Sequence, residues 1–191
     1  MRNSLPLLLL LLFVLPLGAC AQPLNYTMMA PQISAENRFI GPEIEISFRF
    51  ADDRLGILVA NTSEGDVSVE WSSCSFVNAE GQAVRLVPVG DPPLDKLPPG
   101  ARLAAVLTLD QWHKAGKAGP LGRRRETMGR RLVYSPQLTP GVPAMVKVHL
   151  ALVFWELDGM GIAMRRDENF AFEFAVQDPA DLARLTKEGL R

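Results

Sequence analysis

Cysteine and histidine are scarce in this chain, and their scarcity excludes several kinds of site. The 191 residues include two cysteines and two histidines. His113 and His149 lie far apart, and neither has the spacing of a paired metal ligand, so we expect no metal site. The sequence also lacks a Gly-x-Ser-x-Gly elbow, a Ser-x-x-Lys motif and a glycine-rich loop between a strand and a helix. These absences predict a protein that is not an enzyme and binds no diffusible cofactor.

A net excess of charge of either sign is also missing. Lys and Arg number 20 against 21 Asp and Glu, a formal net charge of −1. Without a global basic field, no nucleic-acid partner is expected. The balance is uneven locally, because residues 110–131 contain seven basic and two acidic side chains among glycines and a proline, a local charge of 7 − 2 = +5.

No apolar run is long enough to cross a bilayer. The run from Leu5 to Leu17 is interrupted by prolines and is shorter than the roughly 20 residues that a spanning helix needs. Arg2 precedes this run, and the small residues Gly18 and Ala19 follow it. A cationic start, a short apolar stretch and a small-residue end are typical of a secretory signal.

The four residues Leu17-Gly18-Ala19-Cys20 resemble the lipobox of bacterial lipoproteins. This resemblance covers the first twenty residues, and it implies cleavage between Ala19 and Cys20 and a covalent lipid on the Cys20 sulfur. An ordinary signal peptide, with Cys20 as an incidental first residue, is the alternative. The lipobox implies a protein anchored in the cell envelope. Ala21, where an Asp would retain the protein at the inner membrane, implies the outer membrane, with the domain facing the periplasm.

The length predicts one domain. Removal of the signal peptide, residues 1–19, leaves 191 − 19 = 172 residues, enough for a single hydrophobic core. Residues 20–37 are polar and carry prolines without a sustained apolar period, so we expect a lipidated N-terminus followed by a flexible tether. Residues 38–191 are expected to form one domain that contains the long basic loop at 110–131.

Alternating apolar and polar residues predict short strands along most of this domain. The cleanest example is Ile44–Phe50, while the strand that begins near Val146 is apolar on both faces from Leu150 to Trp155. Asp158-Gly159-Met160-Gly161 predicts a hairpin turn, and the phenylalanines at 170, 172 and 174 are expected to point into the core. Strands at this spacing predict a mainly β fold, a two-sheet antiparallel sandwich.

The stretch from Asn61 through Val67–Trp71 to Phe76 is similar to immunoglobulin-like domains of bacterial lipoproteins. The similarity implies an immunoglobulin-like sandwich, although the bridged cysteine pair of antibody domains is missing. With Cys20 lipidated, Cys74 has no partner in the chain, and we expect a small buried residue rather than a reactive thiol.

The C-terminus predicts a short helix. Asp178 can cap it, and Leu182 and Leu185 would form an apolar stripe on one side. We expect this stripe to cover the outer face of the strand at Ala151, Val153 and Trp155.

These patterns favour a lipid-anchored, non-catalytic binding or assembly module. Alternatives are a periplasm-facing carrier or sensor of an apolar ligand, and a lipoprotein subunit of a secretion or envelope-spanning complex. The expected partners are the membrane, through the lipid anchor, and an envelope protein complex or anionic lipid head groups. The basic loop is either solvated and disordered or makes that second contact through its clustered arginines. These are Arg123, Arg124, Arg125, Arg130 and Arg131.

Overall fold

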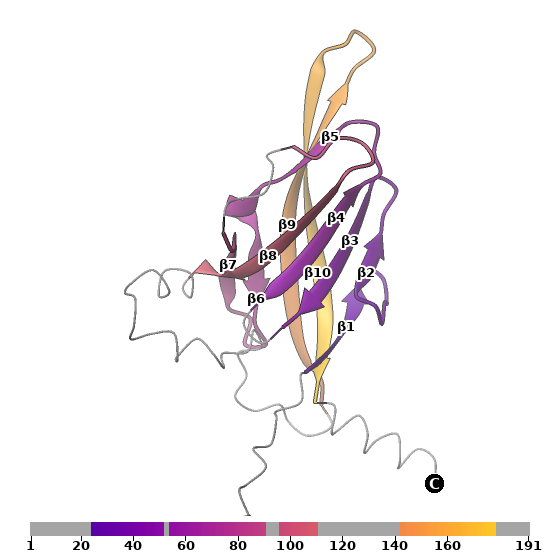
Figure 1. Cartoon of the computed structure of the whole chain (residues 1–191). Helices are drawn as coiled ribbons and strands as arrows, with labels where there is room; N and C mark the ends of the chain where they lie inside the picture. Colours follow the sequence, from indigo (N-terminus) through magenta and orange to yellow (C-terminus); the bar gives the residue numbers. More distant parts are fainter. Residues whose placement is uncertain (1–23, 52–53, 91–95, 111–141, 179–191) are drawn as a thin grey trace, which may run out of the picture.

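The computed structural model describes residues 24–51, 54–90, 96–110 and 142–178, and these residues are mainly β (Figure 1). All strand pairs are antiparallel, which confirms the predicted class. The elements are β1 (Asn25–Ala30), β2 (Arg38–Ile40), β3 (Ile44–Phe50), β4 (Leu55–Asn61), β5 (Asp66–Val69), the 3-10 helix η2 (Trp71–Ser73), β6 (Ser75–Val77), β7 (Ala83–Pro88), β8 (Arg102–Leu109), β9 (Ala144–Leu157) and β10 (Ala163–Gln177).

The strands form one continuous sheet rather than two separate ones. Its order is β1-β10-β9-β6-β7-β8-β4-β3-β2, with β5 added beside β9. Strand β7 joins the two halves, because Ala83–Arg85 pair with β6 and Leu86–Pro88 pair with β8. The sheet therefore curls into a nearly closed barrel (Figure 1). The separate sheets of an immunoglobulin-like sandwich are not confirmed.

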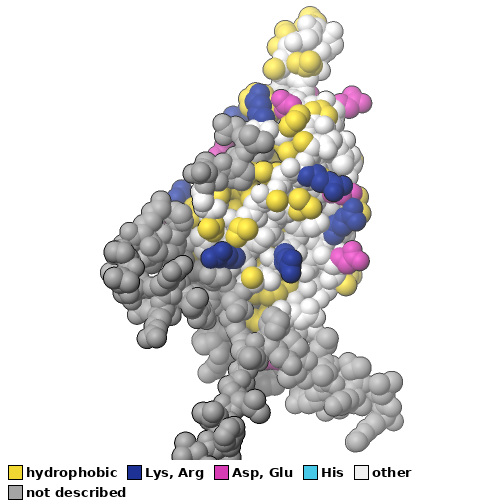
Figure 2. Space-filling view, in the orientation of Figure 1, with side chains coloured by type: hydrophobic (Ala, Val, Ile, Leu, Met, Phe, Trp, Pro, Cys, Tyr) yellow, Lys and Arg dark blue, Asp and Glu magenta, His cyan; other side chains and the backbone are white. Residues whose placement is uncertain are grey.

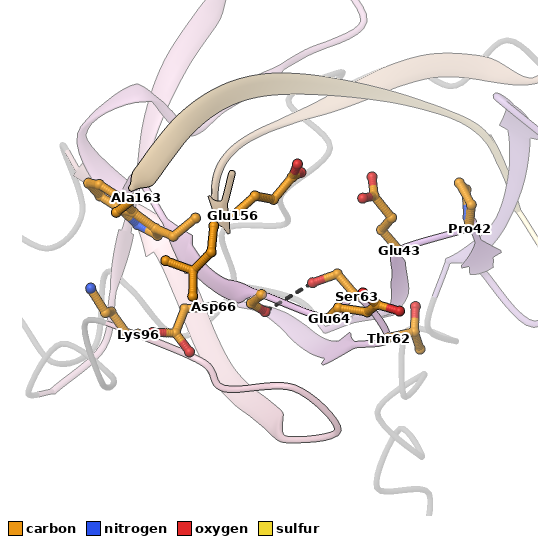
Figure 3. Close-up of a pocket in the computed structure, with 12 residues that line it drawn as sticks. Pro42, Glu43, Thr62, Ser63, Glu64, Asp66, Lys96, Glu156 and Ala163 are labelled. Atoms are coloured by element: carbon orange, nitrogen blue, oxygen red, sulfur yellow. Dashed lines mark hydrogen bonds between the residues drawn. The ribbon is translucent and has the colours of Figure 1, made fainter. Parts of the chain in front are cut away.

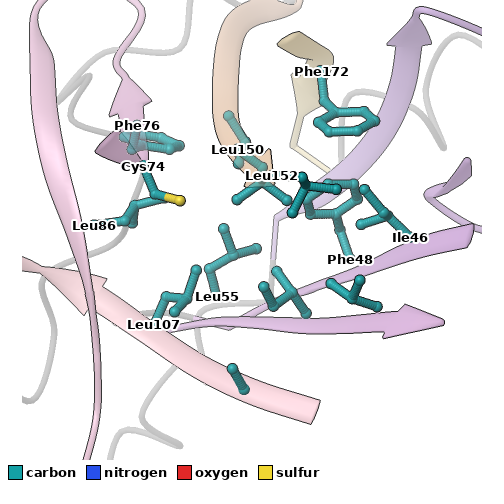
Figure 4. Packing of buried hydrophobic residues seen from close by; sticks show 14 of the residues in the cluster. Ile46, Phe48, Leu55, Cys74, Phe76, Leu86, Leu107, Leu150, Leu152 and Phe172 are labelled. Carbon is teal, nitrogen blue, oxygen red and sulfur yellow. The ribbon is translucent and has the colours of Figure 1, made fainter. Parts of the chain in front are cut away.

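The core fills the inside of this barrel with alternate side chains of nearly every strand (Figure 4). Phe172 of β10 is fully buried, and its ring centroid lies 4.7 Å from that of Phe48 on β3 and 5.5 Å from that of Phe39 on β2. No hydrogen-bonded pairing between β10 and β2 is found among the described residues, and these aromatic contacts link β10 to β2 and β3.

The tether expected at residues 20–37 is wrong for its second part. Asn25–Ala30 form β1, which pairs with β10 and buries Tyr26 and Met28. The Asn37 side chain holds this strand in place, since its Oδ1 accepts from the Met28 amide at 2.8 Å and its Nδ2 donates to the Tyr26 carbonyl at 3.0 Å. The alternation is too short, and too close to Pro31, to stand out in the sequence. Four residues, 21–24, separate Cys20 from β1.

Strands β9 and β10 form one long hairpin that dominates the molecule (Figure 1). Their pairing runs without interruption from Ala144 opposite Val176 to Leu157 opposite Ala163. The predicted turn at 158–161 is confirmed: Asp158 Oδ1 accepts from the amides of Met160 and Ile162, both at 2.8 Å. The inward orientation of the phenylalanines is also confirmed, with Phe172 and Phe174 fully buried and Phe170 packed against the core.

The outer face of β9 is covered in its middle part, as expected from the apolar character of that part. Ala151 and Val153 are buried, and Trp155 is half-buried. The helix predicted to cover this face, with Leu182 and Leu185, lies outside the described residues, as does the basic loop from residue 111 onward.

Candidate binding surface

The projecting end of the β9–β10 hairpin exposes large apolar side chains. We call residues 156–164 the ribbon tip. Its apolar side chains are exposed by 74% at Leu157, 82% at Met160, 57% at Ile162 and 57% at Met164. Figure 2 shows hydrophobic side chains on this end, beyond the body of the molecule. Single exposed apolar residues are ordinary, but four on one projecting element are typical of an interaction site.

The ribbon tip is apolar on both of its faces. Leu157 lies opposite Ala163 on one face, and Met164 lies opposite Glu156 on the other. The neighbouring strand β5 pairs with β9 only as far as Trp155, and β1 pairs with β10 only from residue 173. Among the described strands, both outer edges of the tip are therefore without a pairing partner.

An ionic cluster around Arg166 marks the point where the ribbon leaves the barrel. Residue 166 lies on the inward-facing side of β10, in line with the core phenylalanines. Its guanidinium donates to the Glu43 carboxylate at 2.8 and 2.7 Å and to Glu156 at 2.7 Å, and it also pairs with Glu168. The hydrogen bonds to Glu43 and Glu156 raise the pKa of Arg166 above its usual value. Its guanidinium carbon lies 4.7 Å from the Phe154 ring centroid, so the cluster caps the end of the core.

A cleft of about 880 Å³ lies beside the base of the ribbon (Figure 3). One wall comes from the β9–β10 hairpin, and the other comes from the β2–β3 connection and the β4–β5 loop. Most of the lining groups are polar or acidic. The lining residues are Pro42, Glu43, Thr62, Ser63, Glu64, Gly65, Asp66, Lys96, Trp155, Glu156, Leu157 and Ala163.

The β4–β5 loop is held in place by the buried residue Asn61. Its Nδ2 donates to the carbonyls of Gly65 and Leu97, both at 2.8 Å, and its Oδ1 accepts from the Ser63 amide at 2.9 Å and hydroxyl at 2.7 Å. Gly65 is required at its position, because a Cβ there would lie 2.0 Å from the Trp155 carbonyl oxygen. The loop thus approaches the backbone of β9 at the ribbon base.

Trp155 lines this cleft, and two cationic side chains lie near its ring. Lys96 Nζ lies 4.9 Å from the indole centroid, and the Arg165 guanidinium carbon lies 5.9 Å from it. The Trp155 Nε1 atom is buried and has no hydrogen-bond partner. The indole ring therefore makes cation–π contacts with Lys96 and Arg165 at the base of the ribbon.

The cleft and the ribbon together have an acidic balance. Among the cleft-lining residues and residues 156–168, carboxylates number seven and cationic groups three, a balance of 3 − 7 = −4. The carboxylates are Glu43, Glu64, Asp66, Glu156, Asp158, Asp167 and Glu168, and the cationic groups are Lys96, Arg165 and Arg166.

None of the functional residues predicted from the sequence is among the described residues of this surface. Ala19, Cys20 and the five arginines of the basic loop lie outside the described residues. Cys74 is buried, as predicted, and burial raises the pKa of its thiol, which disfavours the reactive thiolate. In the described ranges, no three His, Cys, Asp or Glu side chains are placed to hold a metal ion. No helix within those ranges has the length and apolar character to cross a bilayer.

The exposure of the ribbon tip was not predicted from the sequence, although the apolar residues around its turn indicate it. The apolar residues Leu157, Met160, Ile162 and Met164 flank and interrupt a strong turn, and a turn of a core hairpin is ordinarily polar. Comparison with known proteins adds no assignment: no protein-family model matches the chain, and no curated protein is significantly similar to it.

Proposed function

We propose that this protein is a lipid-anchored, non-catalytic binding or assembly module of the cell envelope. The exposed apolar ribbon tip carries this proposal. Four large apolar side chains of the tip are exposed to water, although full burial of each would contribute about 1.5–3 kcal/mol of stabilising free energy. Their exposure therefore does not stabilise the fold. A surface of this kind is suited to a partner that buries it.

The position of β1 supports a defined orientation. Asn25 pairs with Gln177, at the end of β10 opposite the ribbon tip. Cys20 precedes Asn25 by five residues, which span at most about 17 Å. The paired length of β9, from Ala144 to Leu157, extends roughly 43 Å. A lipid on Cys20 would thus keep one pole of the domain near the bilayer and direct the tip away from it.

The cleft favours this function over a carrier of an apolar ligand. Four of its twelve lining residues are acidic, and the interior of the barrel is filled by core side chains. The proposal has three further parts. They are a relationship of the fold to immunoglobulin-like domains, a location at the outer membrane, and a second contact through the arginines of the basic loop.

Metabolic labelling tests the anchor. We expect a palmitate analogue to label the wild-type protein and to keep it in the membrane fraction, and we expect Cys20→Ser to lose both properties. A labelled, membrane-bound Cys20→Ser protein would refute the lipid anchor.

Affinity isolation from detergent-solubilised envelopes tests the binding role. The comparison is between the intact protein, a variant lacking residues 113–131, and the double variant Met160→Ser with Ile162→Ser. Loss of a co-purifying complex in the double variant is expected. Unchanged recovery of the same complex from all three proteins would argue against both contact regions.

A further inference from the structure

We propose that the ribbon tip inserts into an apolar cleft with a basic rim on a protein partner. This inference rests on the proposed binding function and names the kind of surface that the tip fits. It follows from the two-faced apolar character of the tip, its bare strand edges and the acidic residues at its base.

The apolar side chains require a partner that encloses them. Leu157 and Ala163 lie on one face of the ribbon, and Met164 lies on the other, while Met160 and Ile162 occupy the turn. A flat surface could cover only one of these faces. A cleft can bury both, and the flexible methionines can adapt to its walls.

The strand edges favour a protein over a bilayer. Beyond Trp155, neither β9 nor β10 has another described strand beside it, so the outward amide and carbonyl groups of the tip need hydrogen bonds. Hydrocarbon cannot supply them, and open sheet edges do not occur in lipid. A protein cleft can supply them from its own backbone, as in strand addition.

The charge distribution favours a basic rim around that cleft. The tip itself contains no Lys or Arg between residues 157 and 164. Carboxylates exceed cations by four over the cleft and residues 156–168, and all of these carboxylates except Asp158 line the cleft or lie beside Arg166, where the rim of an enclosing cleft would lie. An anionic membrane surface would be repelled there, whereas Lys and Arg side chains would be attracted.

The tip is organised before it binds. The Asp158 carboxylate caps the turn through two backbone amides, and Arg166 ties the ribbon base to Glu43. Little conformational freedom is then lost on insertion, which favours binding through a small contact area.

Site-specific photocross-linking in intact envelopes tests the proposal. A benzophenone amino acid replaces Met160 in the full-length protein, and Val106 is the matched control position, an exposed apolar residue on β8. We expect a discrete protein adduct from position 160 and none of that size from position 106. Excess unlipidated Cys20→Ser protein should compete it away, because the site is saturable.

Matched substitutions then test the chemistry of the partner. Ile162→Ser should lower the yield of the adduct by about tenfold or more, whereas Val106→Ser should leave it unchanged. Glu64→Gln with Asp66→Asn should lower the yield several-fold, and added salt should weaken the wild-type complex more than this variant. If the yield of the adduct at position 160 is unchanged by these substitutions and by added salt, the proposal is overturned.

Vesicle sedimentation tests the alternative that the ribbon tip inserts into a lipid bilayer. The Cys20→Ser protein is mixed with phosphatidylcholine vesicles, with and without phosphatidylglycerol, and we expect no binding that depends on Ile162. Three outcomes would overturn the proposal of a protein cleft. They are adducts at position 160 with lipid alone, vesicle binding that depends on the ribbon tip, and the absence of any adduct. A different result would refute only the lipid anchor. In that case the palmitate analogue does not label Cys20, but the protein adduct at position 160 still forms and is still competed away by the Cys20→Ser protein.

Discussion

The β9–β10 hairpin has one continuous backbone pairing but two different environments. Its lower half belongs to the barrel, and its upper half is the ribbon tip, residues 156–164. In the lower half, inward residues such as Leu150 and Phe172 are fully buried. In the upper half, large apolar residues such as Met160 are exposed to water. A regular antiparallel pairing is therefore not enough to make a strand part of the core. Neighbouring strands decide that, and they end at the ribbon base.

The boundary between the halves is visible in the inward-facing positions. They change from Leu152 and Phe154 to Glu156 on β9, and from Phe170 to Glu168 and Arg166 on β10. Charged groups at these positions cannot be buried without partners, so they mark the end of the core. The difference places the contacts that stabilise the fold in the lower half and the surface proposed for binding in the upper half.

The strongest test of this comparison is a large-to-small substitution in the lower half. Phe172→Ala should lower the free energy of unfolding by about 3–5 kcal/mol, because it removes contacts to rings on β2 and β3 and leaves a cavity. Denaturant unfolding measures the loss. Met164→Ala, on the same face of the same strand, is the control. Equal losses in the two variants would contradict the division into halves.

A smaller loss is expected at the loop that meets the ribbon base. Asn61→Ala should cost about 1–3 kcal/mol of unfolding free energy, since it removes the hydrogen bonds of this buried side chain to Ser63, Gly65 and Leu97. Thermal unfolding with Ser63→Ala as the comparison measures it, and the serine variant should lose less because its hydroxyl is partly exposed. A larger loss at Ser63 would contradict the central role of Asn61.

The ionic cluster should contribute less again. Arg166→Met is expected to change unfolding free energy by about 0–1 kcal/mol, because the Arg166 side chain is 40% exposed and solvent screens its ion pairs. Its larger effect should be local, with faster amide hydrogen exchange in residues 156–164 than in the wild type. Arg165→Met, which loses its ion pair with Asp167, is the control. Identical exchange in both variants would refute the role of Arg166 in holding the ribbon.

The smallest change in stability is expected at the tip. Met160→Ser should leave the free energy of unfolding within about 0.5 kcal/mol of the wild type, because the side chain is exposed and packs against nothing in the core. Calorimetry checks this value. A clear drop in melting temperature would show that the tip packs within the molecule in solution, and the comparison between the two halves would fail.

Much of the strand content could be predicted from local patterns. The alternation at Ile44–Phe50 and the turn residues at Asp158–Gly161 specify a strand and a hairpin without help from distant residues. Strand β1 could not be predicted, because its short alternation gains meaning only when Tyr26 stacks on Phe50, with ring centroids 3.9 Å apart. Closure of the sheet depends on such distant contacts.

The candidate surface was harder to predict than the fold. The turn at Asp158 was evident, but its projection depends on where β5 stops, opposite Trp155, and no local pattern encodes that end. The cleft likewise depends on the approach of Gly65 to the Trp155 backbone. The predicted lipid site and basic loop lie outside the described residues and stay predictions.

The charged residues on the inner side of β10 also bear on aggregation. Between residues 163 and 172, β10 pairs only with β9 among the described strands, and such an edge is a template for strands of other chains. A second chain added there would have to cover Arg166 and Glu168, and so remove their charges from water. We therefore expect the side chains that end the core to oppose edge-to-edge joining of crowded copies of the protein, while the apolar turn beyond them is exposed.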